Sequence, residues 1–180
     1  NFAVTGAKAI NANNSKVDIT AVNATLNGDV TTNNAVTIKA TKAAKVNGAV
    51  SANGANSNVS INGEATTITG AVAANGANSN VSINGTASAA ITGAVNANGA
   101  NAAVTVDSAD TTIGSDITAN GKGAKVTAEN LSKLDGNVAT DADGSVELNF
   151  KEGASWTGDN SGNTTMSLSK GTWNGANTGK

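Results

Sequence analysis

The ten residues GANSNVSING occupy positions Gly54–Gly63 and occur again, unchanged, at Gly76–Gly85. A third and altered copy begins with GANAAVTV at Gly99. The copies start 22 and 23 residues apart, a spacing that is typical of proteins built by stacking one structural unit many times. The extent of this repeat decides the fold.

A five-residue unit carries the repeat well beyond the copied decapeptide. It has an aliphatic residue at each end and a glycine between them, as in Leu26–Val30 and Val46–Val50. Further copies are Ile68–Val72, Ile91–Val95, Leu134–Val138 and, with the glycine shifted by one position, Ile113–Ile117. The constant separation of the two aliphatic residues indicates that each copy occupies the same place in successive turns.

A second unit is a short triplet with aliphatic outer residues and, in most copies, a serine or threonine between them. The copies are Val17–Ile19, Val36–Ile38, Val59–Ile61, Val81–Ile83, Val104–Val106, Val126–Ala128 and Val146–Leu148. Because side chains alternate between the two faces of a strand, the outer pair is expected inside and the middle residue outside. Each turn therefore carries two or three short strands separated by Gly- and Asn-rich corners.

Stacking these units predicts three internal aliphatic columns. The columns are Ile10, Val30, Val50, Val72, Val95, Ile117 and Val138; then Val17, Val36, Val59, Val81, Val104, Val126 and Val146; then Leu26, Val46, Ile68, Ile91, Ile113 and Leu134. Disorder does not account for three columns in register. A left-handed hexapeptide β-helix repeats at ~18 residues, whereas these turns vary in length. We therefore expect an all-β, single-stranded, right-handed parallel β-helix of about seven turns of 20–23 residues over positions 1–150, with 151–180 continuing it.

Composition argues against several classes of function. The chain has 11 basic and 13 acidic residues, and all the basic ones are lysine, whereas nucleic-acid binding favours a basic stripe with arginine. Neither Cys nor His is present, which removes the thiolate ligand and the commonest general base. No apolar run approaches the ~18 residues of a membrane helix. We expect a protein without enzymatic activity, cofactor or metal.

Two outward columns are the candidate interaction face. Thr37, Ser60, Ser82, Thr105 and Thr127 form a flat polar column, which suits self-association or glycan contact through many weak hydrogen bonds. An ordinary solvated sheet face is the alternative, and an ice-binding face is a further one. The corner residues Asn53, Asn75, Asn98 and Asn120 are expected to form a ladder of side-chain amides, with a structural or an intermolecular role.

Two acidic groups have weaker patterns. Asp141–Gly144 with Glu147 partly resembles a calcium loop but lacks its spacing of ligands, so a polar corner is the interpretation. Asp107, Asp110 and Asp116 would have to come together to act as the paired carboxylates of a glycosidase. An enzyme acting on polysaccharides therefore stays an alternative.

The end of the chain has a motif of a different kind. Gly153–Gly158 reads GASWTG, and Leu168–Asn174 reads LSKGTWN. This cadence resembles the last coils of the passenger domains of monomeric (type V) autotransporters, of the pertactin-like and AIDA-like kind, in the region called the autochaperone. Trp156 and Trp173 are interpreted as core or cap residues, with Trp156 in a fourth column.

The resemblance implies a function that the residues alone do not give. It implies a protein displayed on the bacterial outer membrane or secreted, acting as an adhesin in cell–cell aggregation, biofilm formation, virulence or host attachment. The partners would be other copies of the chain, or host glycans and proteins, and a C-terminal barrel outside this sequence would contact the membrane. A structural stalk that presents another domain is the alternative.

Overall fold

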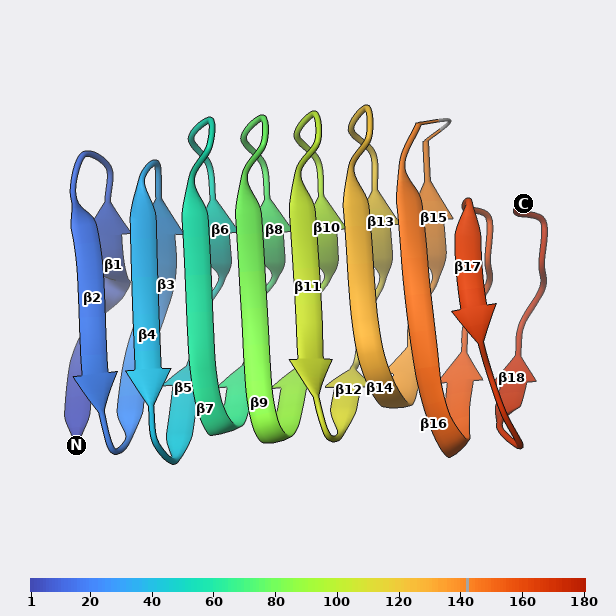
Figure 1. Ribbon diagram of the computed structural model, residues 1–180, viewed down its shortest axis with the longest axis horizontal. Coiled ribbons are helices and arrows are strands. Elements are labelled where there is room, and N and C mark those ends of the chain that lie inside the picture. The colour runs from blue at the N-terminus through green and yellow to red at the C-terminus, as the bar shows by residue number, and fades with distance from the viewer. Residues whose placement is uncertain (142) are drawn as a thin grey trace.

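The computed structural model describes residues 1–141 and 143–180, which form 18 strands and no helix (Figure 1). All the strand pairs are parallel and belong to one continuous sheet wound into a solenoid of about 8 turns. In Figure 1 the chain runs down the near side, returns up the far side, and advances from the N-terminal to the C-terminal end. This winding is right-handed, as the variable turn length predicted.

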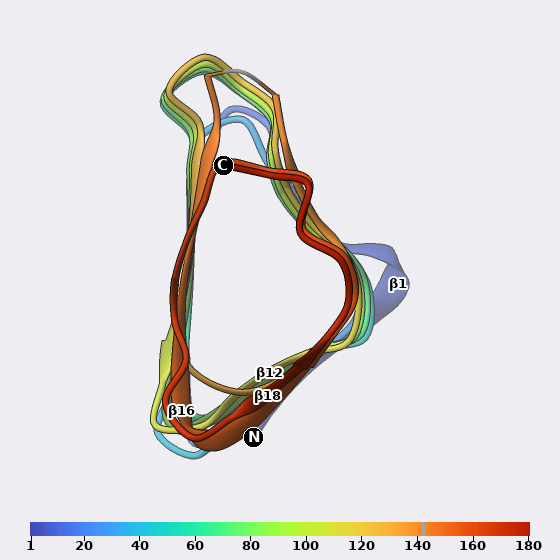
Figure 2. The same cartoon turned by 90° about the vertical axis from the view of Figure 1, so that its right-hand side faces the viewer.

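The cross-section is roughly triangular, so the solenoid has three faces (Figure 2). Face A consists of β2 (Lys16–Ala21), β4 (Ala35–Ala40), β11 (Ala103–Ser108), β17 (Thr164–Ser167), and the first halves of β7 (Asn58–Ile68), β9 (Asn80–Ile91), β14 (Lys125–Asp135) and β16 (Ser145–Thr157). These eight strands pair in succession along the rod. Face A is the flat side on which the predicted polar column lies.

The other two faces share several long strands with face A or with each other. Face B holds β5 (Ala43–Val46), β12 (Thr111–Ile113), β18 (Thr172–Asn174), the second halves of β7, β9, β14 and β16, and the first halves of β1 (Phe2–Ala12) and β3 (Ala24–Thr32). Face C holds the ends of β1 and β3 together with β6 (Val50–Ala52), β8 (Val72–Ala74), β10 (Val95–Ala97), β13 (Ile117–Ala119) and β15 (Val138–Thr140).

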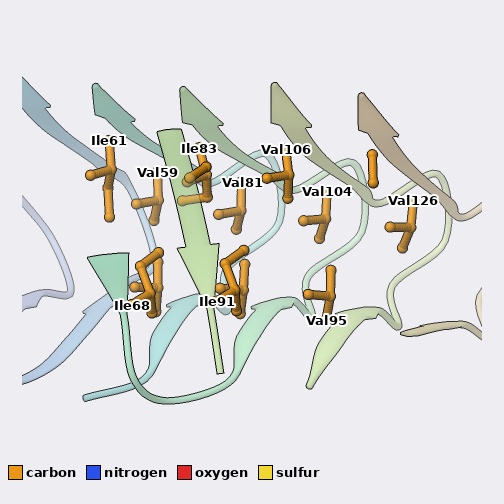
Figure 3. Close-up of a cluster of buried hydrophobic side chains, with 14 of the residues drawn as sticks. Val59, Ile61, Ile68, Val81, Ile83, Ile91, Val95, Val104, Val106 and Val126 are labelled. Carbon is orange, nitrogen blue, oxygen red and sulfur yellow. The ribbon is translucent and has the colours of Figure 1, made fainter. Parts of the chain in front are cut away.

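All three predicted aliphatic columns are confirmed by the strand register. Val59 pairs with Val81 on face A, Ile68 with Ile91 on face B, and Val50 with Val72 on face C. The side chains of these columns meet inside the rod (Figure 3), where most of them are fully buried. A core one side chain deep can therefore be filled by Val, Ile, Leu and Ala, which explains why so few aromatic residues are needed.

The solenoid has about 8 turns, because the Trp-bearing tail adds strands to the seven or so turns expected over positions 1–150. Trp156 pairs with Leu134, and Trp173 pairs with Trp156. Trp156 therefore extends the column of Leu26 on face B, and the prediction of a separate fourth column is wrong. The two indole rings stack with centroids 4.6 Å apart and an angle of 4°. β16 runs through position 150 without a break, and β17 and β18 pair with it.

Within the described residues, four turns carry a protruding hook at the corner between face C and face A, visible at the top of Figures 1 and 2. Each hook begins with the repeated Asn-Gly pair. The sequence suggests that this pair supplies the positive φ of the corner. In three hooks that φ belongs instead to the next asparagine, as in Asn56 (57°) and Asn78 (53°), and in the fourth hook it belongs to Gly123 (68°). The glycines serve close approach instead: a Cβ added to Gly76 would lie 2.1 Å from Gly54 O.

Candidate functional site

The outward column on face A is continuous over the predicted residues. Thr37 pairs with Ser60, Ser60 with Ser82, Ser82 with Thr105, and Thr105 with Thr127. All five side chains are half-buried, since neighbouring strands of a sheet lie ~4.8 Å apart. The column is bounded by acidic residues at both ends, because Asp18 precedes Thr37 and Glu147 follows Thr127.

Two columns of asparagine flank the serines in the middle of face A, and sequence reasoning missed them. Asn80 Nδ2 donates to Asn58 Oδ1 (3.2 Å), and Asn84 Nδ2 donates to Asn62 Oδ1 (2.9 Å). Asn84 Nδ2 also donates to Ser82 Oγ at 3.0 Å, and Asn62 Nδ2 donates to Ser60 Oγ at 3.0 Å. These bonds fix the side chains in place, so the polar groups of face A are preorganised. The N-V-S-I-N strands of the copied decapeptide carry the signal that would have revealed them.

The predicted corner ladder is formed by three of its four residues. Asn75 Nδ2 donates to Asn53 Oδ1 (2.8 Å), and Asn98 Nδ2 donates to Asn75 Oδ1 (2.9 Å). Asn120 occupies the same corner, as its backbone bond to Ala97 O shows, but among the described residues no side-chain bond joins it to Asn98. A second, unpredicted ladder joins Asn101 Nδ2 to Asn78 Oδ1 at the hook tip (3.2 Å). The ladders therefore border the edge of face A and do not lie within it.

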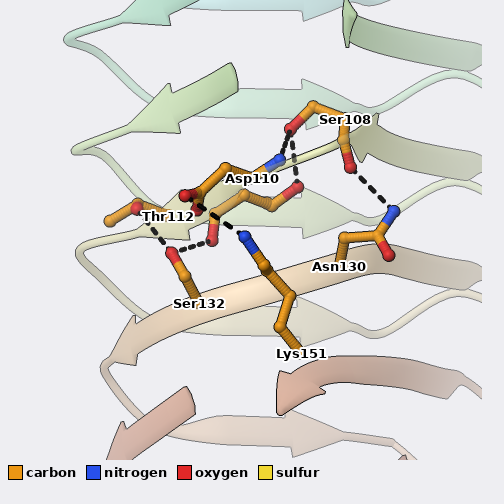
Figure 4. Close-up of polar contacts among 7 residues, drawn as sticks. Ser108, Asp110, Thr112, Asn130, Ser132 and Lys151 are labelled. Carbon is orange, nitrogen blue, oxygen red and sulfur yellow. Dashed lines mark hydrogen bonds and ion pairs between the residues drawn. The ribbon is translucent and has the colours of Figure 1, made fainter. Parts of the chain in front are cut away.

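A group of polar side chains lies at the opposite edge of face A, where it turns into face B (Figure 4). Lys151 Nζ lies 3.4 Å from Asp110 Oδ2. The Ser132 hydroxyl, and then Lys151, lower the pKa of the Asp110 carboxyl, and the slight burial of that carboxyl opposes them. The same edge has a shallow hollow of about 360 Å³, lined by Asn84, Gly85, Thr86, Asp107, Ser108, Ala109 and Asn130.

The structure separates one of the three aspartates of the glycosidase pattern from the other two. Asp107 and Asp110 lie at the edge between face A and face B. Asp116 lies at the corner between face B and face C, where its Oδ1 accepts the backbone N–H of Asn137 at 2.7 Å. Asp116 therefore caps the next turn, as Asp29 does for Ala49 (2.8 Å).

The acidic residues near position 141 form a turn. Asp141 Oδ1 accepts the backbone N–H groups of Gly144 (2.8 Å) and Asp143 (3.2 Å), whereas Ala142, which belongs to the same predicted loop, lies outside the described residues. Glu147 points from face A and binds Lys125 Nζ at 2.6 Å, which lowers the pKa of its carboxyl. The described part of the chain has no group of three or more Asp and Glu side chains arranged to hold a metal ion.

The tail contains an inward polar column that sequence reasoning missed. Asn160 is 5% exposed and follows Val138 in the core column of face C. Its Nδ2 donates to Asn177 Oδ1 (2.9 Å), and its Oδ1 accepts from Gly162 N and Thr164 Oγ1. The matching stretches W-T-G-D-N-S-G at Trp156 and W-N-G-A-N-T-G at Trp173 are the signal of this column.

The described residues contain no helix that is long and apolar enough to cross a membrane. No family model, curated protein or solved structure matches this chain.

Proposed function

We propose that this chain is an adhesive rod of the autotransporter-passenger type, which acts at a bacterial surface through its faces and without a catalytic centre. The observation that carries this proposal is the ordered polar surface of face A, where the same small hydrogen-bonding groups recur in successive turns. Many weak contacts from a rigid repeating surface add up to strong binding when they are made together. Adhesion needs such a surface, and it needs no pocket.

The tail supports the autotransporter part of the proposal. The indoles of Trp156 and Trp173 each donate to a backbone carbonyl of the preceding turn, Gly136 O and Gly158 O, at 2.9 Å. The W-T-G and G-T-W motifs therefore build regular coils at the C-terminal end of the rod. This is the position at which the resembling passengers carry the same cadence.

Display of the chain on a bacterium that does not aggregate tests the proposal. We expect displayed cells to settle faster than cells displaying an unrelated domain, or to bind extracellular matrix or glycan surfaces. Replacing Ser60 and Ser82 by glutamate should abolish the clumping of displayed cells, because four like charges would then meet wherever two such faces came together. The matched control places glutamates at Thr67 and Thr112, which point outward from face B.

A displayed chain that neither clumps cells nor binds any of these surfaces would contradict adhesion by the rod. If the chain is instead a stalk, it should not bind when displayed alone, and binding should appear when it is displayed together with the domain that it presents.

A further inference from the structure

The outward residues of face A between β4 and β11 form a palindrome along the rod. From β4 to β11 the strands present Ala-Thr-Lys, Asn-Ser-Asn, Asn-Ser-Asn and Ala-Thr-Asp. The residues are Ala35, Thr37 and Lys39; Asn58, Ser60 and Asn62; Asn80, Ser82 and Asn84; and Ala103, Thr105 and Asp107. The pattern is unchanged when its direction is reversed, except that Lys39 and Asp107 exchange places.

We propose that face A binds a second copy of this chain, face to face and with the two rods antiparallel. The inference deepens the proposed function, on which it rests, because it names the partner and the orientation. A two-fold axis that runs parallel to the strands, between β7 and β9, places each column opposite the same column of the second copy. Ser60 then faces the second copy's Ser82, and Thr37 faces its Thr105. An isologous contact of this kind requires a self-complementary surface, which the palindrome supplies.

The one difference in the palindrome is an exchange of opposite charges. Lys39 and Asp107 lie in the same outward column, and both are exposed. Within the described residues neither takes part in an ion pair. In the antiparallel arrangement each Lys39 faces an Asp107, so two ion pairs form. In a parallel arrangement with these columns aligned, Lys39 would face a second Lys39.

The hollow beside Asp107 offers room for the lysine side chain. It is open to solvent at the edge of face A and is lined by Asp107 and by the amides of Asn84 and Asn130. These carboxylate and amide oxygens are acceptors, and an ammonium group is a donor of three hydrogen bonds. Glu129 follows Asp107 at this edge, where it accepts from Asn149 Nδ2 at 3.0 and 3.1 Å, and it adds to the negative field.

Charge along the whole rod favours the same orientation. The first 50 residues contain five lysines and two aspartates, whereas residues 107–135, which lie opposite them in an antiparallel overlap, contain five acidic residues and three lysines. Antiparallel rods bring the basic third of one copy near the acidic part of the other, and such complementarity speeds association and fixes its register. In this arrangement Lys16 of one copy faces Lys125 of the other. The two like charges are tolerated because Glu147 forms an ion pair with Lys125 at 2.6 Å.

The middle of face A keeps hydrogen-bonding capacity for a partner. Ser60 and Ser82 each accept an amide N–H from a neighbour on their own strand, so their hydroxyl protons are still available to donate. Overlap of six turns, ~4.8 Å apart, along strands ~20 Å long gives ~600 Å² per copy. The total of ~1,200 Å² lies at the lower limit of stable interfaces, so we expect a dissociation constant in the range of about 1–100 μM.

Site-specific cross-linking tests the orientation, and the chain has no cysteine of its own. The variants Thr37→Cys and Thr105→Cys are mixed and treated with a bismaleimide that spans about 10 Å, the distance between packed sheets. We expect cross-linked dimers from the mixture and none from either variant alone. In the antiparallel dimer, position 37 of one chain and position 37 of the other would lie three turns apart along the rod. Cross-linking of Thr37→Cys with itself would contradict the antiparallel arrangement.

Charge reversal tests the pairing of Lys39 with Asp107. In sedimentation at low salt, Lys39→Asp and Asp107→Lys should each weaken dimerisation about tenfold or more, because like charges then face each other twice. The double variant, and an equal mixture of the two single variants, should recover dimers to within about threefold of the unchanged chain. The matched control is Lys45→Asp on face B, which changes net charge equally and should leave the dimer intact.

Equal weakening by Lys45→Asp, failure of the double variant to recover, or a chain that stays monomeric at millimolar concentration would overturn the inference. These outcomes are separate from a failure of the proposed function. Displayed cells that clump or bind surfaces, although the purified chain stays monomeric at millimolar concentration, would leave adhesion in place and remove this dimer. A dimer of the purified chain without any adhesion of displayed cells would keep the dimer and contradict the proposed adhesive function.

Discussion

Two buried serines in the hooks illustrate how single residues depart from an ideal stack. Ser57 and Ser79 are each 1% exposed, and their hydroxyl oxygens have no hydrogen-bond partner in the described structure. The same place in the next two hooks is taken by Ala102 and Ala124, which are fully buried. The position therefore requires a small side chain, and a hydroxyl group there is desolvated without compensation.

We predict that Ser79→Ala stabilises the protein. An unsatisfied buried hydroxyl costs about 1–3 kcal/mol, so the free energy of unfolding measured by denaturant titration should rise by roughly 1 kcal/mol. The reverse change, Ala102→Ser, is the matched control and should lower it by a similar amount. If Ser79→Ala were instead less stable, the hydroxyl would have a partner, such as a bound water, and the assignment would be wrong.

At the scale of the elements, columns of glycine set how closely neighbouring corners stack. A Cβ at Gly99 would lie 2.1 Å from Gly76 O, and one at Gly121 would lie 2.2 Å from Gly99 O. At Gly114, in the copy of the five-residue unit whose glycine is shifted, the nearest atom to an added Cβ is Thr92 Cα at 3.7 Å. Glycine is thus required by backbone contact in the hook and is dispensable at the shifted position.

Substitution by alanine should separate these two glycines. Gly99→Ala forces the hook away from its neighbour, and we expect a loss of about 3 kcal/mol or more in the free energy of unfolding. Gly114→Ala should change it by less than about 1 kcal/mol. Thermal denaturation followed by circular dichroism measures both. A Gly99→Ala protein as stable as Gly114→Ala would show that the hooks do not stack as tightly as the structure has them.

Sequence reasoning succeeded for features that repeat from turn to turn. The valine and isoleucine columns were predicted because a stacked turn must place equivalent residues above one another. The positive φ of the hook was expected at the Asn53-Gly54 pair but lies at Asn56. The glycine of that pair is needed instead for close contact with the neighbouring turn. The inward Asn160 was missed because the tail repeats after 17 residues, from Trp156 to Trp173, and the body does not.

The palindrome of face A depends on pairing that one turn alone does not reveal. Lys39 and Asp107 are separated by 68 positions in the sequence, and they share a column only because three intervening registers place them there. The predicted column of Thr37, Ser60 and Ser82 was visible from its spacing. Its relation to the flanking asparagines and charges required the structure.

Considered as a whole molecule, the rod is a stack in which each turn pairs with the turns next to it. Repeat proteins of this kind gain stability turn by turn, and terminal turns have a neighbour on one side only. β17 and β18 form the last turn, and Trp173 in β18 is half-buried, whereas Trp156 one turn earlier is 1% exposed. The C-terminal turn is therefore expected to detach before the body unfolds.

The stacked indoles allow that detachment to be followed by spectroscopy. The chain has two tryptophans and no tyrosine, and both tryptophans lie in the tail, parallel and 4.6 Å apart. Intrinsic emission and the exciton signal of the coupled rings therefore report on the tail alone, whereas far-ultraviolet circular dichroism reports on every strand. On heating we expect emission to change at a lower temperature than dichroism, and coincident transitions would show that tail and body melt as one cooperative unit.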